Sequence, residues 1–278
     1  MSEWPKISII TPSYNQGKFL ERTILSVIEQ NYQNLEYIII DGGSTDGSVE
    51  IIKKYADKLV YWVSEKDNGQ THALNKGFKK ATGEIVAWLN SDDEYCPGAL
   101  WAVAETFMED REIDFVFGNI YDIDGNNKVL RDARHTTFSF TALIVLGSIL
   151  SQCASFWKRE LFEKYGYLDE SKRFSMDYEF FCRIGYYIKA KHIRKPLAKF
   201  RWHDTSKSST IVHVSIKEHG SVHDQYVTKV CKGYPEWLIK ILMHVCRAYK
   251  YSAQGDSLYV IRGILRRALP SSLRPRAL

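Results

Sequence analysis

Four short apolar runs near the start of the chain each end in a polar cluster, and this pattern constrains the fold more than any other feature. The runs occupy residues 6–11, 35–40, 59–64 and 84–89. Stretches with helical spacing of apolar residues separate them, at residues 18–30, 48–56 and 68–82. Because strands that alternate with helices build parallel sheets, we predict an α/β fold with a Rossmann-like, mostly parallel central sheet and helices on both faces.

The polar clusters indicate where a ligand is expected to bind. They follow the four predicted strands, at Thr11–Asn15, Asp41–Asp46, Glu65–Gln70 and Asn90–Asp93. In sheets of this class, the loops at the carboxyl ends of the strands form the ligand crevice. The first of these loops lacks the G-x-G-x-x-G pattern, which disfavours a dinucleotide-dependent dehydrogenase.

The fourth cluster, Asn90-Ser91-Asp92-Asp93, carries two adjacent carboxylates at a predicted strand end. Hard divalent cations such as Mg²⁺ and Mn²⁺ prefer one or two carboxylates together with phosphate oxygens. The pair is therefore a candidate metal site. The alternative is that Asp92 or Asp93 caps a helix that begins near Pro97.

The second cluster combines two glycines with two acidic residues. Gly42 and Gly43 allow the backbone to approach a ligand closely. Asp41 ends an apolar strand, where a carboxylate needs a partner, so we expect it to contact a ligand. For Asp46 we expect a simpler role, in which its side chain caps the following helix.

Together with Ala73-x-Asn75-Lys76-Gly77, these motifs resemble the pattern of family 2 glycosyltransferases, which are inverting enzymes with the GT-A fold. The resemblance covers about the first 210 residues and is strongest in about the first 100. It is nearest to bacterial enzymes that build exopolysaccharide, capsule or O-antigen units. The resemblance implies transfer of a sugar from a nucleotide-diphosphate donor, most commonly a UDP-sugar, to a glycan or polyprenyl-linked acceptor, with Mn²⁺ or Mg²⁺ as cofactor.

The resemblance also implies a set of donor-binding residues. In this pattern Asp41 accepts a hydrogen bond from the base, Lys76 lies near the diphosphate, and a basic loop after His203 covers the diphosphate. The nucleotide-sugar residues so implied are Thr11, Pro12, Ser13, Tyr14, Asn15, Asp41, Ser44, Asp67, Gln70, Asn75, Lys76, Asn90, Ser91, Asp92 and Lys207. The implied metal ligands are Asp92, Asp93 and His203. Asn90 stands where many members have the first Asp, so the choice between Asp92 and Asp93 as the metal ligand stays open.

A carboxylate must also remove a proton from the acceptor hydroxyl in a direct displacement. Family 2 enzymes take this base from a Glu-Asp pair at the start of a helix. Here Met176 stands where the Glu often is, so Asp177 is the predicted catalytic base and Glu179 the alternate. The competing interpretation is that Asp177 only caps its helix.

The segment that starts at Gln152 resembles a family stretch that runs along the acceptor side, which implies that the acceptor binds beside it. Within that segment Trp157 is a candidate for stacking on a sugar face, and the alternative is that Trp157 belongs to an aromatic core.

From the extent of the resemblance we assign residues 1–210 to the glycosyltransferase domain, with a nucleotide-binding half (1–95) and an acceptor half (96–210). Residues 211–278 are assigned to a helical, basic C-terminal extension.

Two segments of the extension, 235–252 and 257–269, are predicted amphipathic helices with basic residues beside an apolar stripe. Basic amphipathic helices bind anionic bilayer surfaces. The alternative is that these helices pack on the domain or on a second subunit, as a homo-oligomer.

The net charge, the cysteine content and the apolar stretches bear on whether the protein binds nucleic acid, forms disulfides or enters a membrane. The net charge of +5 does not by itself indicate nucleic-acid binding, and none is expected. The five cysteines are dispersed and odd in number, which predicts reduced thiols. The N-terminus shows no signal-peptide pattern, and the apolar stretches are too short to span a bilayer. We therefore expect a cytoplasmic protein, in peripheral contact with the inner face of the membrane. The alternatives to a glycosyltransferase are a nucleotidyltransferase and a non-catalytic protein that binds sugar nucleotides.

Overall fold

The computed structural model describes residues 4–147, 150–235 and 237–239, together with positions 241, 245, 248 and 252. Within these residues, nine strands form a single sheet. The strands are β1 (Ile7–Ser13), β2 (Leu35–Asp41), β3 (Tyr61–Ser64), β4 (Ile85–Trp88), β5 (Glu94–Tyr95), β6 (Phe115–Asp124), β7 (Val129–Ala133), β8 (Ser155–Lys158) and β9 (Ala190–Trp202).

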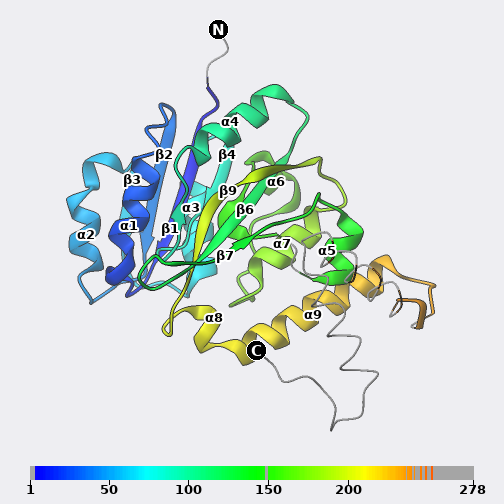
Figure 1. The fold of residues 1–278 in the computed structure, drawn as a ribbon. Helices are drawn as coiled ribbons and strands as arrows, with labels where there is room; N and C mark the ends of the chain where they lie inside the picture. Colours follow the sequence, from blue (N-terminus) through cyan, green and yellow to red (C-terminus); the bar gives the residue numbers. More distant parts are fainter. Residues whose placement is uncertain are drawn as a thin grey trace.

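One half of the sheet is parallel, in the order β3-β2-β1-β4. In the other half, β8 lies antiparallel between β4 and β6, and β9 pairs with β6 in parallel. Two short additions are antiparallel, β5 on β9 and β7 on β6. The predicted α/β fold with a mostly parallel sheet is therefore confirmed, and the loops after β1 to β4 share one edge of it (Figure 1).

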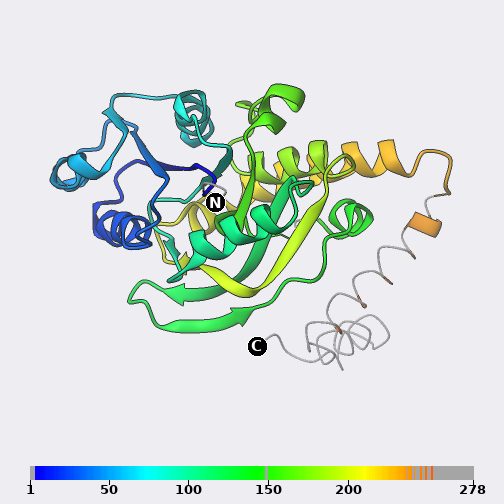
Figure 2. The same ribbon diagram turned by 90° about the horizontal axis from the view of Figure 1, so that it is seen from above.

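Helices cover both faces of this sheet. They are α1 (Gly17–Ile28), α2 (Ser48–Lys54), α3 (Gln70–Lys80), α4 (Ala99–Glu109), α5 (Phe140–Leu146), α6 (Glu160–Tyr165), α7 (Met176–Ile184), α8 (Lys207–Thr210) and α9 (Val212–Val230). Two 3₁₀ turns, η1 (Ala56–Lys58) and η2 (Gln152–Ala154), complete the described elements. In the view of Figure 2, α1 and α2 lie at one end of the molecule and α9 extends from the other.

Alternate residues of the central strands build two separate cores, because successive side chains of a strand point to opposite faces. Ile7 and Ile9 of β1 pack with α1, α2 and α4 on one face. Ile10, the next position along, packs with α3, α6 and α7 on the other face. The helices predicted for both faces are thus explained by strands that are apolar on both sides.

The chain beyond β8 departs from the sequence-based prediction. From Asp177 to Ala190 the sequence alone predicts one helix, but the second part of that prediction is wrong, because α7 ends at Ile184 and Ala190 already begins β9. No sequence pattern indicated β9. Pro196 interrupts its pattern, and the sheet accommodates this proline at a shift of register opposite Asn119.

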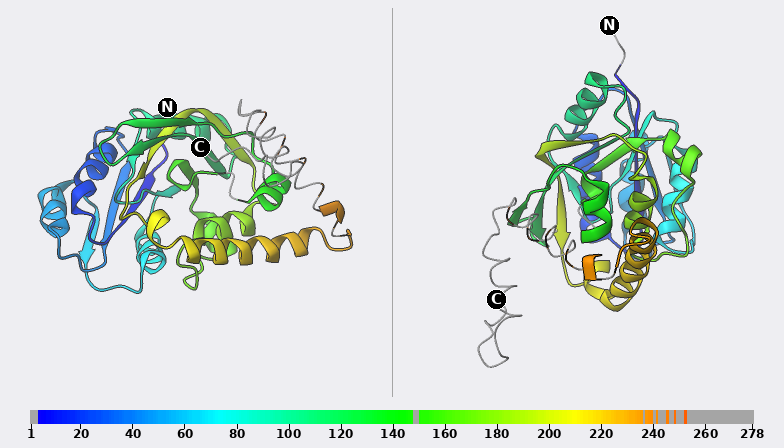
Figure 3. Two further views of the ribbon diagram at one scale, coloured as in Figure 1. Left: turned by 60° about the horizontal axis from the view of Figure 1, so that its bottom comes forward. Right: turned by 90° about the vertical axis from the view of Figure 1, so that its right-hand side faces the viewer.

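The C-terminal extension begins with α9, which precedes the two helices expected from the sequence. α9 packs against α5 and α7, with Val222 and Tyr226 buried, and Figure 3 shows it as the long yellow-to-orange helix. The described positions of the expected helix 235–252 have helical backbone after residue 236. The expected helix 257–269 lies outside the described residues. In the part of the chain that the structure describes, no helix combines the length and apolar character needed to cross a bilayer.

Candidate functional site

The loops after β1 and β2 are joined by hydrogen bonds at the shared edge of the sheet. The backbone N–H of Asn15 donates to Ser44 Oγ at 2.8 Å, and the N–H of Thr45 donates to Asn15 Oδ1 at 2.9 Å. Asn15 holds a left-handed backbone with φ 51°, a conformation that Asn tolerates better than most residues. The first two sequence motifs therefore form one continuous surface.

Asp41 lies beneath this surface and holds the loop after β2 in place. Its side chain is fully buried and accepts hydrogen bonds from the N–H groups of Gly43 and Ser44 and from the hydroxyls of Ser44 and Ser64, at 2.5–3.1 Å. The partner that a buried carboxylate needs is thus supplied by the chain itself in this conformation. The predicted ligand contact of Asp41 would replace some of these bonds.

Asp46 has the capping role expected from the sequence. Its Oδ1 accepts from the N–H and the hydroxyl of Ser48, the first residue of α2, while Oδ2 accepts from the N–H of Gly17, the first residue of α1. One carboxylate therefore satisfies backbone donors at the starts of two helices, where N–H groups lack partners within the helix.

Gly42 permits a close approach between the β1 and β3 loops. A Cβ atom at Gly42 would lie 2.8 Å from Asp67 Oδ2 and 3.3 Å from Tyr14 Cδ2, so no other residue fits without movement. Tyr14 is 62% exposed, and Asp67 accepts from the N–H of Gly69 at 2.7 Å. Both side chains are therefore at least partly accessible beside Gly42, Tyr14 from the first cluster and Asp67 from the third.

The rest of the first motif is buried. Thr11, Pro12 and Ser13 all lie within β1, and the Thr11 hydroxyl bonds the buried hydroxyl of Tyr37 at 3.0 Å. The expected contact between the Thr11 side chain and a base is therefore not supported in this conformation, because that side chain has no exposed surface. Sequence spacing could not reveal this, since β1 continues two residues beyond its predicted end.

The two carboxylates after β4 occupy different environments. Asp92 Oδ2 lies 3.0 Å from His203 Nε2, whose other ring nitrogen bonds Thr205 Oγ1 at 2.9 Å. Asp93 is 1% exposed, and its Oδ1 accepts from the backbone N–H of Arg201 at 3.0 Å. Burial, and next the charge of Asp92, raise the pKa of Asp93 well above its ordinary value. Asp92 is the carboxylate left at the mouth of the site.

Arg201 on β9 supports this arrangement, although no motif in the sequence marks it as a site residue. The guanidinium group is almost fully buried, and it donates to the Asp92 backbone carbonyl and to Glu94 Oε1 at 2.7 and 2.5 Å. It also lies over the Phe19 ring, 4.9 Å from the ring centroid. Arg201 fixes the backbone around Asp92 and Asp93, because it bonds the Asp92 carbonyl and is itself held by the buried ion pair with Glu94. Loss of either charged partner would leave the other buried and unpaired.

A chain of side-chain amides connects the metal candidates to α8. Lys207 Nζ donates to Gln70 Oε1 at 2.7 Å, and Gln70 Nε2 donates to Asn90 Oδ1 at 2.7 Å. Asn90 in turn donates to Asp93 Oδ2 and to Gln152 Oε1, at 3.2 and 3.3 Å. Five sequence-predicted site residues from four separate segments are therefore brought together here, while the neighbouring Ser91 is buried.

Two predicted donor residues on α3 are engaged elsewhere. Asn75 is buried and binds the backbone of Leu168 through both its oxygen and its nitrogen, and it also donates to Glu170. Lys76 forms an ion pair with Glu65. In this conformation Asn75 has a structural role, and Lys76 must leave Glu65 to reach a diphosphate.

Asp177 lies at the second position of α7, half-buried, and accepts from the N–H of Tyr178 at 2.8 Å. Burial raises the pKa of Asp177, and the Lys207 ammonium partly opposes this shift. Burial likewise lowers the pKa of Lys207 to about 8, against the opposing charges of Asp177 and Glu218. A carboxylate with a raised pKa beside a buried amine is typical of acid–base sites, although the contact with Tyr178 also fits the capping interpretation.

Glu179, the alternate base, serves the fold. Residues two apart on a helix point in nearly opposite directions. Glu179 is buried, forms a bidentate ion pair with Arg183 and accepts from Tyr226 of α9 at 3.2 Å. All of these contacts are structural, so the geometry favours Asp177 over Glu179.

Trp157 belongs to the aromatic core. Its side chain is fully buried, stacks on Phe115 at 6.0 Å and packs edge-on to Trp88 at 5.6 Å. The expectation that Trp157 stacks on an acceptor sugar is therefore wrong for this structure, and the alternative stated for it is correct. Gln152 remains at the site, held by Asn90 and by the Trp88 carbonyl.

Asp92 and His203 suit a metal ion whose remaining coordination positions are filled by a bound diphosphate and water. Among the described residues, no group of three or more His, Cys, Asp or Glu side chains lies close enough to hold an ion. Asp92 and His203 supply one oxygen and one nitrogen. Mg²⁺ and Mn²⁺ commonly take one or two protein ligands and complete their shell with phosphate oxygens and water.

The model of glycosyl transferase family 2 matches residues 8–182. The putative teichuronic acid biosynthesis glycosyltransferase TuaG of Bacillus subtilis is 39% identical over 121 residues, which cover 42% of this chain and 48% of TuaG.

Two solved structures are similar in fold. TarS from S. aureus, in complex with UDP-GlcNAc, has a TM-score of 0.68 at 18% identity, covering 95% of this chain and 82% of that one. The mannosyltransferase PcManGT from Pyrobaculum calidifontis, in complex with GDP-Man and Mn²⁺, has a TM-score of 0.61 at 20% identity, covering 98% and 78%. The GT-A type of fold expected from the sequence is thereby confirmed.

Proposed function

The chain belongs to glycosyltransferase family 2, and we propose that it transfers one sugar from a nucleotide-diphosphate sugar to a hydroxyl group of a glycan or lipid-linked acceptor, with inversion. The observation that carries the proposal is the convergence of Asp92, His203, Lys207 and Asp177 at one edge of the sheet. These groups match the needs of the reaction: a cation site, a positive charge for the leaving group, and a base.

We assign the donor to the half of the domain formed by residues 1–95. Tyr14 and Asp67 are placed beside the base and ribose, and Asp41 and Ser44 shape the floor beneath them. A UDP-sugar is the favoured donor, because the similar protein TarS binds UDP-GlcNAc. Discrimination among UDP, dTDP and GDP is left to the loops after β1 to β3.

Asp92 and His203 would hold Mn²⁺ or Mg²⁺ together with the donor diphosphate; PcManGT was solved with Mn²⁺. The ion supplies Lewis-acid stabilisation of the diphosphate leaving group. Asp93 supports the site from the interior, since its carboxylate is committed to the Arg201 backbone and to Asn90. His203 is held in place by Thr205.

Asp177 acts as the base in a single displacement. It accepts the proton of the acceptor hydroxyl while that oxygen forms a bond to the anomeric carbon of the donor. The bond from that carbon to the diphosphate oxygen breaks on the opposite side, so the configuration inverts. The Lys207 ammonium compensates the negative charge that develops on the departing nucleoside diphosphate.

We place the acceptor beside Gln152, in the half formed by residues 96–210, and propose a role in cell-surface polysaccharide biosynthesis. The similarity to TuaG supports this setting. Residues 211–278 form the proposed extension. Within it, Trp237, Ile241 and Val245 recur at helical spacing and are 63%, 50% and 59% exposed, which supports peripheral contact with the inner face of the membrane. Association with a second copy of the chain is the alternative use of this stripe.

The products formed from a nucleotide sugar distinguish a glycosyltransferase from a nucleotidyltransferase and from a binding protein. A nucleotidyltransferase would release pyrophosphate from a nucleoside triphosphate, and a binding protein would hold the donor without consuming it. Release of a nucleoside diphosphate from a nucleotide sugar, dependent on a divalent cation and on Asp177, is the test of the proposed function.

A further inference from the structure

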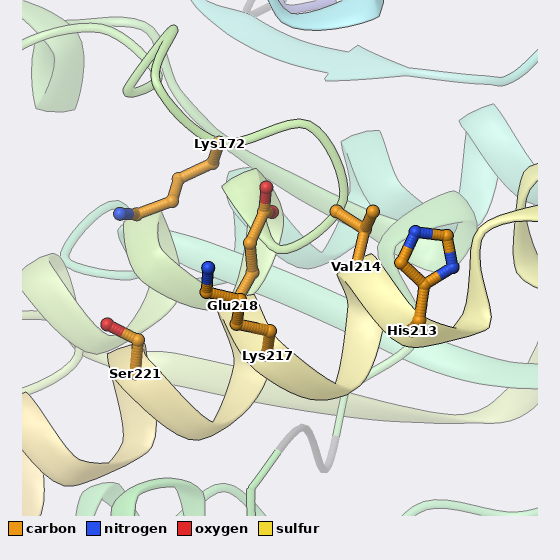
Figure 4. Close-up of a pocket in the computed structure, with 6 residues that line it drawn as sticks. All are labelled: Lys172, His213, Val214, Lys217, Glu218 and Ser221. Atoms are coloured by element: carbon orange, nitrogen blue, oxygen red, sulfur yellow. The ribbon is translucent and has the colours of Figure 1, made fainter.

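A second cleft lies between α9 and the segment that leads into α7. It has a volume of about 420 Å³. The residues that line it are Lys172, His213, Val214, Lys217, Glu218 and Ser221. Figure 4 shows Lys172 on the segment facing α9, and the other five side chains along one side of that helix. Neither the metal candidates nor the β1 to β4 loops contribute to this cleft.

The acid in the cleft is already used by the chain. Glu218 accepts hydrogen bonds from the backbone N–H groups of Arg173, Phe174 and Ser175, at 2.8–3.1 Å. Burial alone would raise the pKa of Glu218, but these three bonds hold it below its ordinary value. The Glu218 carboxylate therefore stays charged, and its hydrogen bonds fix the backbone that leads into α7, up to Ser175, two residues before Asp177.

The basic groups around the cleft are incompletely neutralised. Lys172 has one loose ion pair, 3.7 Å from Asp169. Across the described residues, neither Lys217 nor the exposed Arg173 has an ion pair or a side-chain hydrogen bond. Lys172, Lys217 and His213 therefore line one concavity whose single acid, Glu218, is occupied by backbone groups. Such a surface favours an anion from outside the chain.

The cleft is close to the proposed base. Glu218, which lines the cleft, accepts from the backbone N–H of Ser175 at 3.1 Å, and Ser175 is two residues before Asp177. A molecule that presents a hydroxyl to Asp177 can therefore reach the cleft with a neighbouring group.

Resting on the proposed function, we propose that this cleft binds a phosphate ester carried by the acceptor substrate. The ammonium groups of Lys172 and Lys217 come from two chain segments, and the His213 imidazole lines the same cleft. Donors that approach from separate directions suit a tetrahedral phosphate better than a planar carboxylate. The phosphate group can be a terminal monoester on the acceptor, or a diester that links a lipid to its sugar or joins two units of a polymer. In both cases the cleft selects the acceptor and leaves the donor site untouched.

The test uses the His213 imidazole as a local reporter in the full-length protein. Methyl phosphate, dimethyl phosphate and acetate are each titrated while UDP and Mg²⁺ occupy the donor site, and the imidazole resonances of His213 are followed by NMR. We expect saturable shifts with a phosphate ester and at least about tenfold weaker binding in the Lys172→Gln/Lys217→Gln variant, because two charge-assisted contacts are lost. The matched control is Lys229→Gln, an exposed position farther along α9, which should bind as the unmodified protein does.

Each outcome separates the possibilities. Tighter binding of methyl phosphate indicates a terminal monoester, and tighter binding of dimethyl phosphate indicates a diester that links a lipid to its sugar or joins two units of a polymer. Acetate that binds as tightly as either, or affinity that is unchanged in the double variant, overturns the inference. The proposed function is judged separately by nucleoside diphosphate release, which the double variant should retain when water replaces the acceptor.

Discussion

His203 Nε2 lies 3.0 Å from Asp92 Oδ2, although 111 positions separate the two residues in the chain. The contact joins the loop after β4 to the segment that follows β9. Thr205 holds the other imidazole nitrogen, which fixes the ring so that Nε2 faces the carboxylate. Orientation of a ligand histidine by a second partner is the usual way in which proteins prepare a metal site.

Metal binding is expected to depend on the donor, because Asp92 and His203 supply only two ligands. Mn²⁺ titrations followed by electron paramagnetic resonance should show weak binding alone and tighter binding with UDP. Asp92→Asn should weaken the UDP-dependent affinity by at least about 10-fold, and EDTA should abolish activity. Asp57→Asn, at an exposed position on η1, is the control. Full activity of Asp92→Ala and Asp93→Ala in EDTA would refute the metal assignment.

The base assignment distinguishes two carboxylates on one short helix. Asp177→Asn keeps the shape of the side chain and removes its basicity, so transfer should slow at least about 100-fold while donor binding is unchanged. The rate of the unmodified protein should also fall on the acid side, as pH drops through the raised pKa of Asp177. Glu179→Gln should lower thermal stability through its ion pair with Arg183 but leave the rate of the folded enzyme near normal. Normal transfer by Asp177→Asn together with loss in Glu179→Gln would reverse the roles.

Lys207 predicts the alkaline side of the pH profile. Burial lowers its pKa to about 8, so the free enzyme loses this positive charge as pH rises through that value. Donor kcat/KM should therefore fall above pH about 8, whereas kcat should persist to higher pH because a bound diphosphate favours the charged amine. Asp177 and Glu218 also favour the charged form, and Arg173 opposes it. Lys207→Arg should remove the alkaline fall, since arginine stays protonated. An identical fall in Lys207→Arg would assign it to another group.

The extension is expected to bind anionic membranes through the stripe of Trp237, Ile241 and Val245. Liposome flotation at low salt should recover the full-length protein with anionic vesicles, and salt should weaken the interaction. Substituting the three apolar residues by serine should reduce the recovered fraction. A protein that ignores anionic liposomes, or a change of oligomer size in the same variant, would favour packing between subunits.

The first half of the fold was predictable because its signals are local. Residues 6–89 alternate short apolar runs with helical spacing, and each predicted strand and helix there is found within a few residues of its expected ends. The capping role of Asp46 was likewise readable from its position before a helix.

The remaining errors concern contacts between distant segments. Burial of Trp157 depends on residues of β6, β4 and α7, none of which is near it in sequence. β9 was missed because Pro196 resembles an interruption, and only pairing with β6 turns that interruption into a tolerated shift. Arg201 and Glu218 act on backbone groups more than 40 residues away, and no local pattern marks them.

The most direct test of the account is turnover of a donor panel. UDP-, dTDP- and GDP-sugars are screened with the full-length protein in Mn²⁺, with and without EDTA, by thermal shift and by release of the nucleoside diphosphate. We predict that a subset, with UDP-sugars foremost, raises the melting temperature and is turned over only with the metal, and that Asp177→Asn retains the thermal shift but loses turnover. A donor that binds without release of nucleoside diphosphate under any condition, or no binding by any nucleotide sugar, would contradict the account.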